Sequence, residues 1–390
     1  MRLTMPERTQ RYGRLLATRK ARQNALQAVV LTALALLVWM LLSNLIENLS
    51  ADGARIDFSF LLNESGFDVN ETLIAYDAGS SYLSALLVGA LNTVHLTLVG
   101  LVCSTAIGVL VGLLQLGDIK ILRILCRLYV DSMRNLPKLL ILLAVYVLLV
   151  LELPVAREAI SFFDLAFLSN RGLNFPAVEI DYGLLTEPRT LLAAALFLLA
   201  FSLAWLAVRR LVQGIFLRRF LPILFLVAGL ILTTGVVGFD IPEFAGFNFE
   251  GGSVVSIPFL SLAVALSVYH GAQVAEVVRS GILSVPKGQV EAGRALGLSP
   301  SQISWLIVLP LALRVMIPPL TNQYLNLLKN TSIGLAVGYS DLVSIMNTSI
   351  NQTFRPVELM LVTMTVYLVI GIAASVALNV FNRRVQLRER

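Results

Sequence analysis

Long runs of uncharged, apolar residues are the feature that most restricts how this chain can fold. A helix needs roughly 20 apolar residues to cross the hydrocarbon core of a bilayer. Only 14% of the 390 residues are charged, against about 25% in an average soluble domain. The sequence therefore predicts an all-α polytopic membrane protein with about eight transmembrane helices, in the runs Ala25–Ile46, Leu83–Leu116, Leu136–Leu151, Thr190–Val208, Phe220–Val237, Ile257–Val278, Ile303–Leu328 and Val357–Phe381.

Three of these runs need separate comment. The first has no small-residue cleavage pattern and exceeds the length of a signal-peptide core, so we expect a retained span. The third is short, because Arg134 and Lys138 flank it. We expect its helix to start earlier and to let these two side chains snorkel to the membrane surface. The seventh run is interrupted by prolines.

The distribution of Lys and Arg predicts the orientation, since short cytoplasmic loops retain these residues. With the N-terminus inside, the inner segments 1–24, 117–138, 209–219, 284–304 and 382–390 hold 22 basic and five acidic residues. The outer segments 48–82, 152–189 and 239–256 hold four basic and 15 acidic residues. Both termini are then cytoplasmic, which requires an even number of spans. We expect the larger outer segments to fold as small caps.

No group of residues in the sequence suits catalysis. Cys103 and Cys126 fit neither a disulfide framework nor a metal site, and His95 and His270 are far apart in sequence. A Gly-rich phosphate loop with its Lys is also absent from the sequence. The basic residues lie between apolar runs, which argues against nucleic-acid binding. We therefore predict no enzyme activity, no metal and no cofactor in this chain.

The loop between the sixth and seventh runs has the pattern of a helical hairpin. Residues 289–296 suit a helix, Gly297 suits a left-handed C-terminal residue, and Ser299-Pro300 suits the start of a second helix. A short helix would then lie across the membrane face. It would present Glu291 and Arg294 to a partner.

These residues resemble the signature loop of permease subunits of bacterial ATP-binding-cassette importers. Glu291-Ala292-Gly293, Gly297, Ile307, Leu309 and Pro310 keep the spacing of that motif, with Gly293 in place of a second Ala. The substitution costs about 1 kcal/mol of helix propensity, although a Gly can permit closer docking. Neighbouring segments resemble the polar-amino-acid branch of these permeases: 275–282, 285–289, 309–314, 317–320, 329–332 and 338–342. Segment 129–137 departs from the family at Asp131 and Ser132.

The outer segments and the extra first span are similar to the permeases of broad-range L-amino-acid importers, and most similar to the first permease of such a system. The resemblance implies a type I importer permease fold in a bacterial inner membrane. It implies a second permease chain, homomeric or heteromeric, two ATPase subunits that bind Mg-ATP, and a periplasmic amino-acid-binding protein. The expected organisation is an N-terminal region of residues 1–82, a permease domain 83–381 with the coupling loop 284–310, and a tail 382–390. The coupling residues would be Gln289, Glu291, Ala292, Gly293, Arg294, Gly297, Ile307, Leu309 and Pro310.

Polar residues inside the spans are candidates for the substrate path, because they are expensive in a membrane. His270, Gln273 and Glu276 recur every three residues on the sixth run, and Arg279 follows. Glu276 and Arg279 could instead pair with each other. Asn322 and Asn326 lie on the proline-containing seventh run, which is either broken and lines the pathway or is a kinked packing helix.

Two other functions remain open on the sequence alone. An ion-gradient-driven amino-acid transporter would need charged residues paired in mid-span, and these are scarce. A non-transporting scaffold or sensor would need a soluble signalling domain, for which no loop is long enough.

Overall fold

The computed structural model describes residues 19–51, 56–180, 187–208 and 237–385, together with residues 222, 226 and 229. The chain divides into two compact units, Met1–Phe60 and Leu61–Arg390. The first contains one long helix, α2 (Arg19–Ala51), whose apolar window is not buried by the rest of the chain. The second contains all the elements discussed below.

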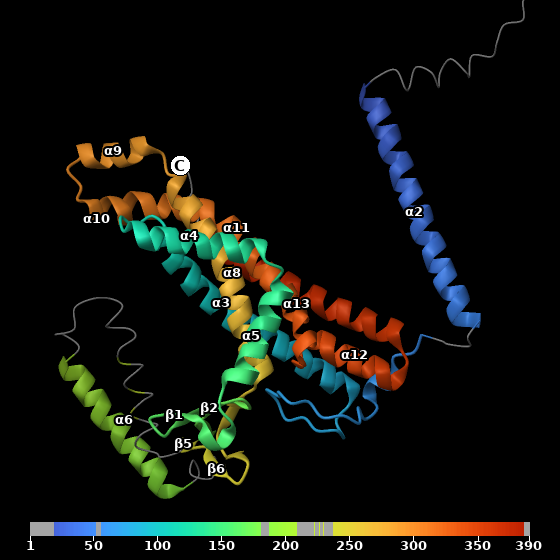
Figure 1. Cartoon of the computed structure of the whole chain (residues 1–390), viewed down its shortest axis with the longest axis horizontal. Coiled ribbons are helices and arrows are strands. Elements are labelled where there is room, and N and C mark those ends of the chain that lie inside the picture. Colours follow the sequence, from blue (N-terminus) through green and yellow to red (C-terminus); the bar gives the residue numbers. More distant parts are fainter. Residues whose placement is uncertain are drawn as a thin grey trace, which may run out of the picture. The chain divides into compact units, whose positions relative to one another are not determined.

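Helices make up most of the second unit (Figure 1). The long ones are α3 (Tyr82–Leu114), α4 (Lys120–Asn135), α5 (Lys138–Glu152), α6 (Pro188–Val208), α8 (Ile257–Leu283), α11 (Leu309–Asn330), α12 (Leu342–Thr353) and α13 (Pro356–Val385). The short ones are the 3₁₀ helices η1 (Ser59–Leu62), η2 (Ala156–Glu158) and η5 (Thr331–Val337), the α-helices α9 (Lys287–Ala295) and α10 (Pro300–Ile303), and the π-helix η4 (Ser304–Val308).

Five helical segments of the described residues are long and apolar enough to span a membrane, and a bent pair would make a sixth. The five correspond to the first, second, sixth, seventh and eighth predicted runs. The fourth run forms α6, in which only Leu192–Ser202 counts as a shorter apolar helix. The fifth run lies almost entirely outside the described residues. The count of eight spans therefore stays a prediction.

The third run differs from the prediction. Its helix does not start earlier, because α4 ends at Asn135 and α5 begins at Lys138 at an angle of 109° to it. Leu136 and Pro137 between them have extended backbone. Proline cannot donate a helical hydrogen bond, and it disfavours helical geometry in the residue before it. The basic residues before the bend therefore belong to a separate amphipathic helix.

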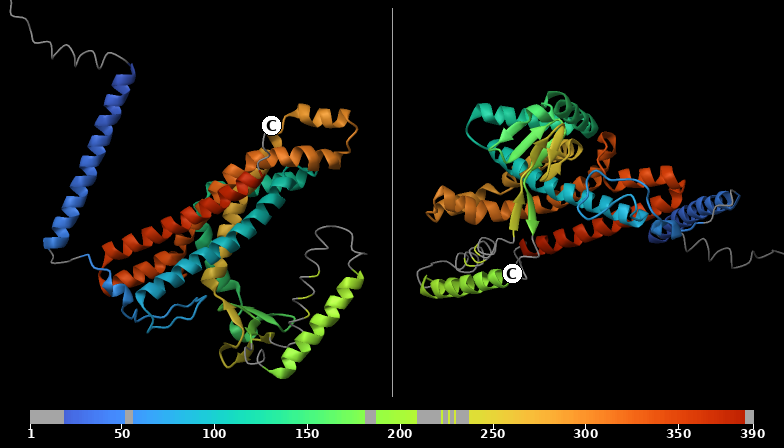
Figure 2. Two further views of the ribbon diagram at one scale, coloured as in Figure 1. Left: turned by 180° about the vertical axis from the view of Figure 1, so that it is seen from behind. Right: turned by 90° about the horizontal axis from the view of Figure 1, so that it is seen from below.

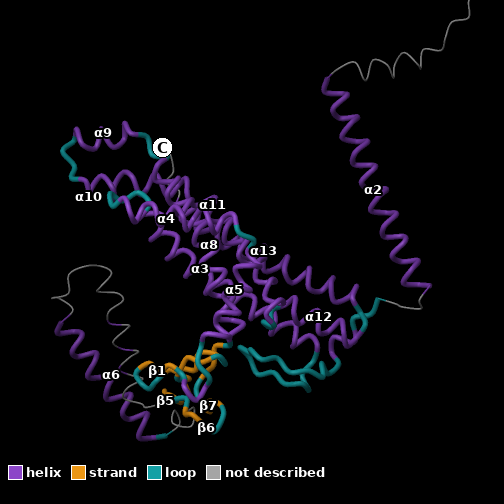
Figure 3. Tube along the Cα trace, viewed as in Figure 1, coloured by secondary structure: helices purple, strands orange, loops and turns teal. Residues whose placement is uncertain are grey.

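The prediction of an all-α chain is incomplete, because the outer segments contain strands. The largest sheet has the order β1-β2-β3-β8, from Ile160–Phe162, Ala166–Ser169, Gly172–Phe175 and Ser253–Val255. Two further sheets have two antiparallel strands each. One pairs β4 (Ala177–Ile180) with β5 (Val237–Asp240), and the other pairs β6 (Glu243–Ala245) with β7 (Asn248–Glu250). Figure 3 shows these strands together, in orange. β8 ends at Val255, just before α8 begins at Ile257. The larger outer segments, 48–82 and 152–189, are those expected to fold as caps. Strands β1 to β4 lie in 152–189, whereas the described residues of 48–82 hold η1 and an isolated bridge between Glu64 and Ser81.

The centre of the second unit is the parallel pair α3 and α8. Gly108 lies against Gly271 and Val274, and Gly112 lies against Ala275 and Val278, so both helices run in the same direction. Small residues permit such close approach of backbones in membrane helices. α5 returns along α8 and buries Ile141 and Leu142 with Leu262 and Leu266.

At the opposite end of α3 from Gly112, a buried polar group anchors α12. The side chain of Asp341 is fully buried and accepts a hydrogen bond from the backbone N–H of Ser344 at 2.8 Å, which caps the helix. Burial raises the pKa of Asp341 to about 6. The neighbouring Tyr339 donates to the carbonyl of Asn92 on α3 at 3.0 Å. These contacts connect the segment after η5 to α3.

Candidate functional site

The predicted loop after the sixth run is a helical hairpin, formed by α9 and α10. α9 ends at a left-handed Gly297, with φ of 76°. The backbone N–H of Gly297 donates to the carbonyl of Arg294 at 2.9 Å, and that of Leu298 donates to the carbonyl of Gly293 at 3.1 Å. This is the Schellman arrangement that glycine favours at a helix end. The predicted left-handed conformation of Gly297 at the end of the helix is confirmed.

The second arm of the hairpin begins with a capping box. The backbone N–H of Gln302 donates to Ser299 Oγ at 3.3 Å, and the backbone N–H of Ser299 donates to Gln302 Oε1 at 2.9 Å. The arm then continues through the π-helix η4 into α11. The hairpin is therefore joined to α8 on one side and to α11 on the other (Figures 1 and 2).

Gly293 is the residue that lets the two arms of the hairpin meet. It is buried, and a Cβ at this position would lie 2.7 Å from Ile307 Cδ1 and 3.2 Å from Ile303 Cγ1. Gly293 in place of Ala therefore permits close approach of the two arms within the hairpin. This approach involves Ile307, another residue of the motif.

The outer surface of the hairpin is exposed. Glu291, Ala292 and Arg294 are exposed, and so are the large apolar side chains of Leu296 at 79%, Trp305 at 69% and Leu306 at 65%. Exposed apolar side chains grouped with charged ones are typical of an interaction site. The arrangement therefore suits docking of a partner protein on the exposed surface of the hairpin.

The polar residues predicted on α8 separate into two groups. His270 is buried, its Nε2 lies 3.0 Å from the side-chain amide of Asn330 at the end of α11, and Lys138 of α5 donates to Asn330 Oδ1. Three helices are held together at this point. Glu276 binds Arg279 with two hydrogen bonds, of 2.7 and 3.1 Å, so the alternative that these two residues pair is confirmed.

The seventh run is not broken at its internal prolines. α11 is continuous through Pro318 and Pro319, and the irregular turn is the π-helix before Leu309. Asn322 and Asn326 are both exposed on α11.

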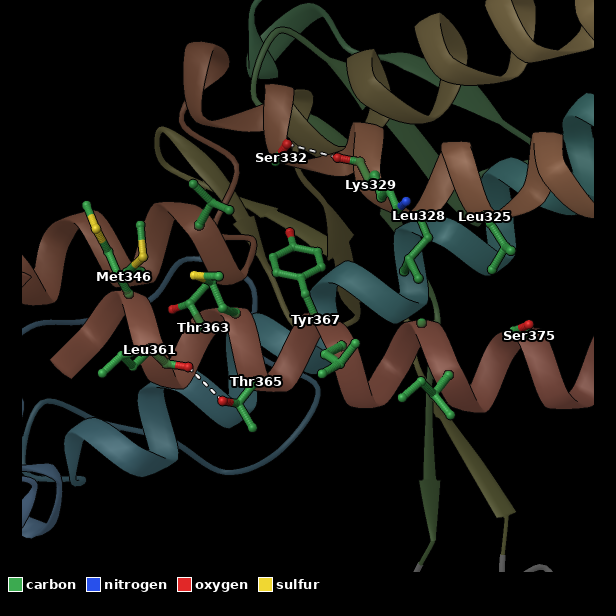
Figure 4. A pocket seen from close by; sticks show the side chains of 16 residues that line it. Leu325, Leu328, Lys329, Ser332, Met346, Leu361, Thr363, Thr365, Tyr367 and Ser375 are labelled. Carbon is green, nitrogen blue, oxygen red and sulfur yellow. Dashed lines mark hydrogen bonds between the residues drawn. The ribbon is translucent and has the colours of Figure 1, made fainter. Parts of the chain in front are cut away.

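A cavity of about 980 Å³ lies between α11, α12 and α13 (Figure 4). Its walls are mostly apolar and carry one ammonium group, from Lys329, and several hydroxyl groups. The polar lining residues are Lys329, Ser332, Thr363, Thr365, Tyr367 and Ser375. Neither Asn322 nor Asn326 is among the lining residues. The sequence reasoning left the role of Lys329 open and overlooked the hydroxyl groups of α13, since a single Thr or Ser in an apolar run gives no signal by itself.

The comparisons with known proteins agree on one family. The family model of the binding-protein-dependent transport system inner membrane component matches residues 211–387. The general L-amino acid transport system permease protein AapQ of Rhizobium johnstonii is 38% identical, over 93% of this chain and 92% of its own length. The putative amino-acid ABC transporter permease protein YhdX of Escherichia coli is also 38% identical, over 93% and 94%.

A third relative is the glutamate/glutamine/aspartate/asparagine transport system permease protein BztB of Rhodobacter capsulatus. It is 34% identical, over 97% of both chains. Among solved structures, an amino-acid ABC transporter with histidines matches with a TM-score of 0.46 and 19% identity, over 78% of this chain and 95% of that chain.

Proposed function

The chain belongs to the family of binding-protein-dependent transport system inner membrane components, and we propose that it is the permease subunit of an ATP-driven importer of L-amino acids. The observation that carries this proposal is the likeness to amino-acid permeases over more than nine tenths of the chain. The relatives named above include none described as an ion-gradient-driven carrier.

The hairpin is the place where a partner ATPase, which holds Mg-ATP, would drive this chain. A motor can shift a conformational equilibrium only if its docking energy differs between the two states. The docking surface would be formed by Gln289, Glu291, Ala292 and Arg294, with Gly293, Gly297, Ile307, Leu309 and Pro310 holding the hairpin in shape. Because the hairpin continues into both α8 and α11, force applied to it reaches both helices.

The substrate path is better supported at the cavity than at the residues predicted on α8. His270 and Glu276 have partners within the chain, so these two suit helix packing, whereas Gln273 is half-buried on α8 and stays a candidate. Asn322 and Asn326 stay candidates for the pathway, because they are exposed on α11. An amino acid carries a carboxylate, and Lys329 is the one cation in the wall of the cavity.

Replacing Lys329 with methionine is expected to lower amino-acid uptake by roughly 10- to 100-fold, the equivalent of a charged hydrogen bond of about 1.5–3 kcal/mol. Methionine keeps the length of the side chain and removes only the ammonium group. Initial rates of labelled amino-acid uptake would measure the effect. Lys329→Arg, which keeps the charge, should retain more activity than Lys329→Met. If both variants transported as fast as the unchanged chain, Lys329 would not be part of the substrate path.

The topology of eight spans, with both termini cytoplasmic, is supported by the pairing of β4 with β5. Ile180 at the end of β4 lies opposite Val237 at the start of β5. The chain between them must therefore return to where it left, which requires an even number of crossings. The two predicted runs in this interval meet that requirement. We keep the predicted organisation of a permease domain of residues 83–381 between an N-terminal region of residues 1–82 and a tail of residues 382–390 as part of the proposal.

The cap formed by β1 to β8 suits docking of the periplasmic amino-acid-binding protein. It directly precedes the first turn of α8, whereas the hairpin follows the last turn, so the two lie at opposite ends of a membrane-spanning helix. Two turns of the cap present exposed aromatic side chains, Phe163 at 96% and Phe247 at 86%. The described residues of the cap include four exposed acidic residues, Glu158, Asp164, Glu243 and Glu250, and two exposed basic ones, Arg157 and Arg171. This surface fits a soluble partner with an apolar pocket and a basic rim.

Phe163→Asn is expected to weaken stimulation of ATP hydrolysis by the binding protein at least about tenfold, since buried aromatic anchors typically contribute 2 kcal/mol or more. Phe163 has a left-handed φ of 56°, which asparagine tolerates better than phenylalanine. The cap should therefore stay folded or gain stability. Titration of the binding protein against the reconstituted complex would measure the shift, with Phe163→Tyr as the conservative control. An unchanged titration would place the docking surface elsewhere.

Reconstitution of this chain with its permease, ATPase and binding-protein partners tests the function as a whole. Uptake of labelled L-amino acids into proteoliposomes should require enclosed ATP and the binding protein. It should survive an ionophore that collapses ion gradients. Uptake that persists without ATP and stops with the ionophore would establish an ion-driven carrier instead.

A further inference from the structure

α4 carries an apolar face that the described residues of the chain leave uncovered. Ile121, Ile124, Leu125 and Leu128 follow the spacing of one helical face and are exposed at 70%, 54%, 55% and 62%. The helix has a polar face as well, so that its apolar and polar residues are sharply separated. Such a helix lies at the interface of a membrane, with its apolar side about 5–10 Å into the boundary between headgroups and acyl chains.

The position of α4 in the fold places it at a membrane surface. Val130 packs against Ala272 and Ala275 of α8, and Tyr129 donates to the carbonyl of Val268 at 2.6 Å. α4 begins soon after the end of α3, and α3 runs parallel to α8, so its first residues lie at the same end of the bundle as the hairpin. The 109° bend before α5 turns α4 across the direction of α5, which packs along α8.

Charged residues indicate how deep α4 lies in the membrane. Asp131 and Arg134 lie within electrostatic reach of the Glu276–Arg279 pair on α8. α8 has 27 residues, which makes it about 40 Å long, roughly 10 Å more than a hydrocarbon core. The Glu276–Arg279 pair therefore stands near the point where α8 leaves the hydrocarbon, and Asp131 and Arg134 of α4 lie near this pair.

Two of the remaining cations of α4 lie where the helix itself disfavours them. Lys120 and Arg123 occupy the first turn, where the helix dipole favours acids, and the N-cap residue Ile119 offers no side-chain cap. Arg123 donates from Nε and Nη2 to the carbonyl of Gly117, at 3.2 and 2.7 Å. Lys120 and Arg127 are exposed. An external anion would compensate for this placement.

We infer that α4 is an interfacial helix that inserts its apolar face into the cytoplasmic leaflet and binds anionic phospholipid headgroups through Lys120 and Arg127. Anionic lipids fit both parts of this surface, because their acyl chains would cover the apolar face and their headgroups would pair with the adjacent cations. Because α4 packs on α8, which continues into the hairpin, lipid binding would stabilise the helix that transmits force from the ATPase.

The first test measures the depth of α4 in the assembled transporter. In nanodiscs, with Cys103 and Cys126 replaced by serine, a fluorophore attached at Leu128→Cys should be quenched by lipids that carry a spin label on the acyl chain. A fluorophore at Arg127→Cys should be quenched by aqueous iodide. Quenching of the Leu128 position by iodide, or its protection from lipid quenchers by the ATPase subunits, would overturn the inference. This readout needs no transport, so it is independent of the proposed function.

The second test measures how the activity depends on the charge of the lipid headgroups. ATP hydrolysis stimulated by the binding protein is measured in nanodiscs of phosphatidylcholine with increasing phosphatidylglycerol. Each cation near an anionic surface contributes about a fivefold effect on binding. Lys120→Gln combined with Arg127→Gln should therefore raise the phosphatidylglycerol fraction needed for half-maximal activity severalfold, whereas Arg189→Gln, at an exposed position at the start of α6, should not. Identical lipid dependence of the double variant and the unchanged transporter would contradict the inference.

Discussion

Replacing Glu291 with lysine is expected to reduce amino-acid uptake more than about 30-fold, while the chain still inserts and assembles. Glu291 is exposed on α9 and lies on the surface proposed to dock the ATPase. Reversing a charge at such a surface places like charges together, which costs several kcal/mol. Uptake and ATP hydrolysis measured in the same proteoliposomes would show the two processes uncoupled. Asp118→Lys, the same charge reversal at an exposed position of the α3–α4 loop, should leave uptake near normal.

Gly297 provides a second test of the hairpin that involves backbone conformation alone. Its φ of 76° is left-handed, and a Cβ at this position would meet nothing within 4 Å. Valine is strained in this conformation, whereas asparagine tolerates it. Gly297→Val should therefore uncouple transport, and Gly297→Asn should retain most of it. Full transport by both Glu291→Lys and Gly297→Val would contradict the assignment of the hairpin.

Replacing Gly108 with valine is expected to prevent the permease unit from folding, with a cost of more than about 3 kcal/mol from overpacking. A Cβ on Gly108 would lie 2.4 Å from Val274 Cβ and 2.9 Å from the carbonyl oxygen of Gly271. The second contact is with backbone, which cannot move without separating α3 from α8. Yield of monodisperse protein and its thermal unfolding in detergent would measure the loss.

A matched control for Gly108 lies on α13. A Cβ on Gly371 would meet nothing within 4 Å, so Gly371→Val makes the same substitution in a spanning helix without a clash. Its yield and unfolding temperature should stay close to those of the unchanged chain. If Gly108→Val folded equally well, the close packing of α3 on α8 would be wrong.

The hairpin was the region of the site that sequence reasoning predicted best. Its shape follows from local chemistry: a left-handed glycine, a capping box at Ser299 and a helix-compatible stretch before them. Each of these signals involves residues a few positions apart, which is the range over which sequence patterns are informative. The contact of Gly293 with Ile307 was not predicted, although both were singled out, because it depends on how the two arms close.

The substrate path was predicted less well. Polar residues at regular spacing on one helix identify candidates, but their partners are on other helices. Asn330 of α11 lies between His270 of α8 and Lys138 of α5, and no local pattern reveals that meeting. The cavity next to Lys329 is likewise formed by three helices from the last third of the chain.

The sequence by itself determined that this chain spans a membrane and which loop turns back as a hairpin, whereas the side of each loop stays a prediction of the positive-inside rule. These properties depend on hydropathy, on charge and on turn chemistry, all of which act over short stretches. The tertiary structure alone decided the pairing of β3 with β8 and the closeness of α3 to α8. These depend on contacts between residues far apart in sequence, whose energies no single segment contains.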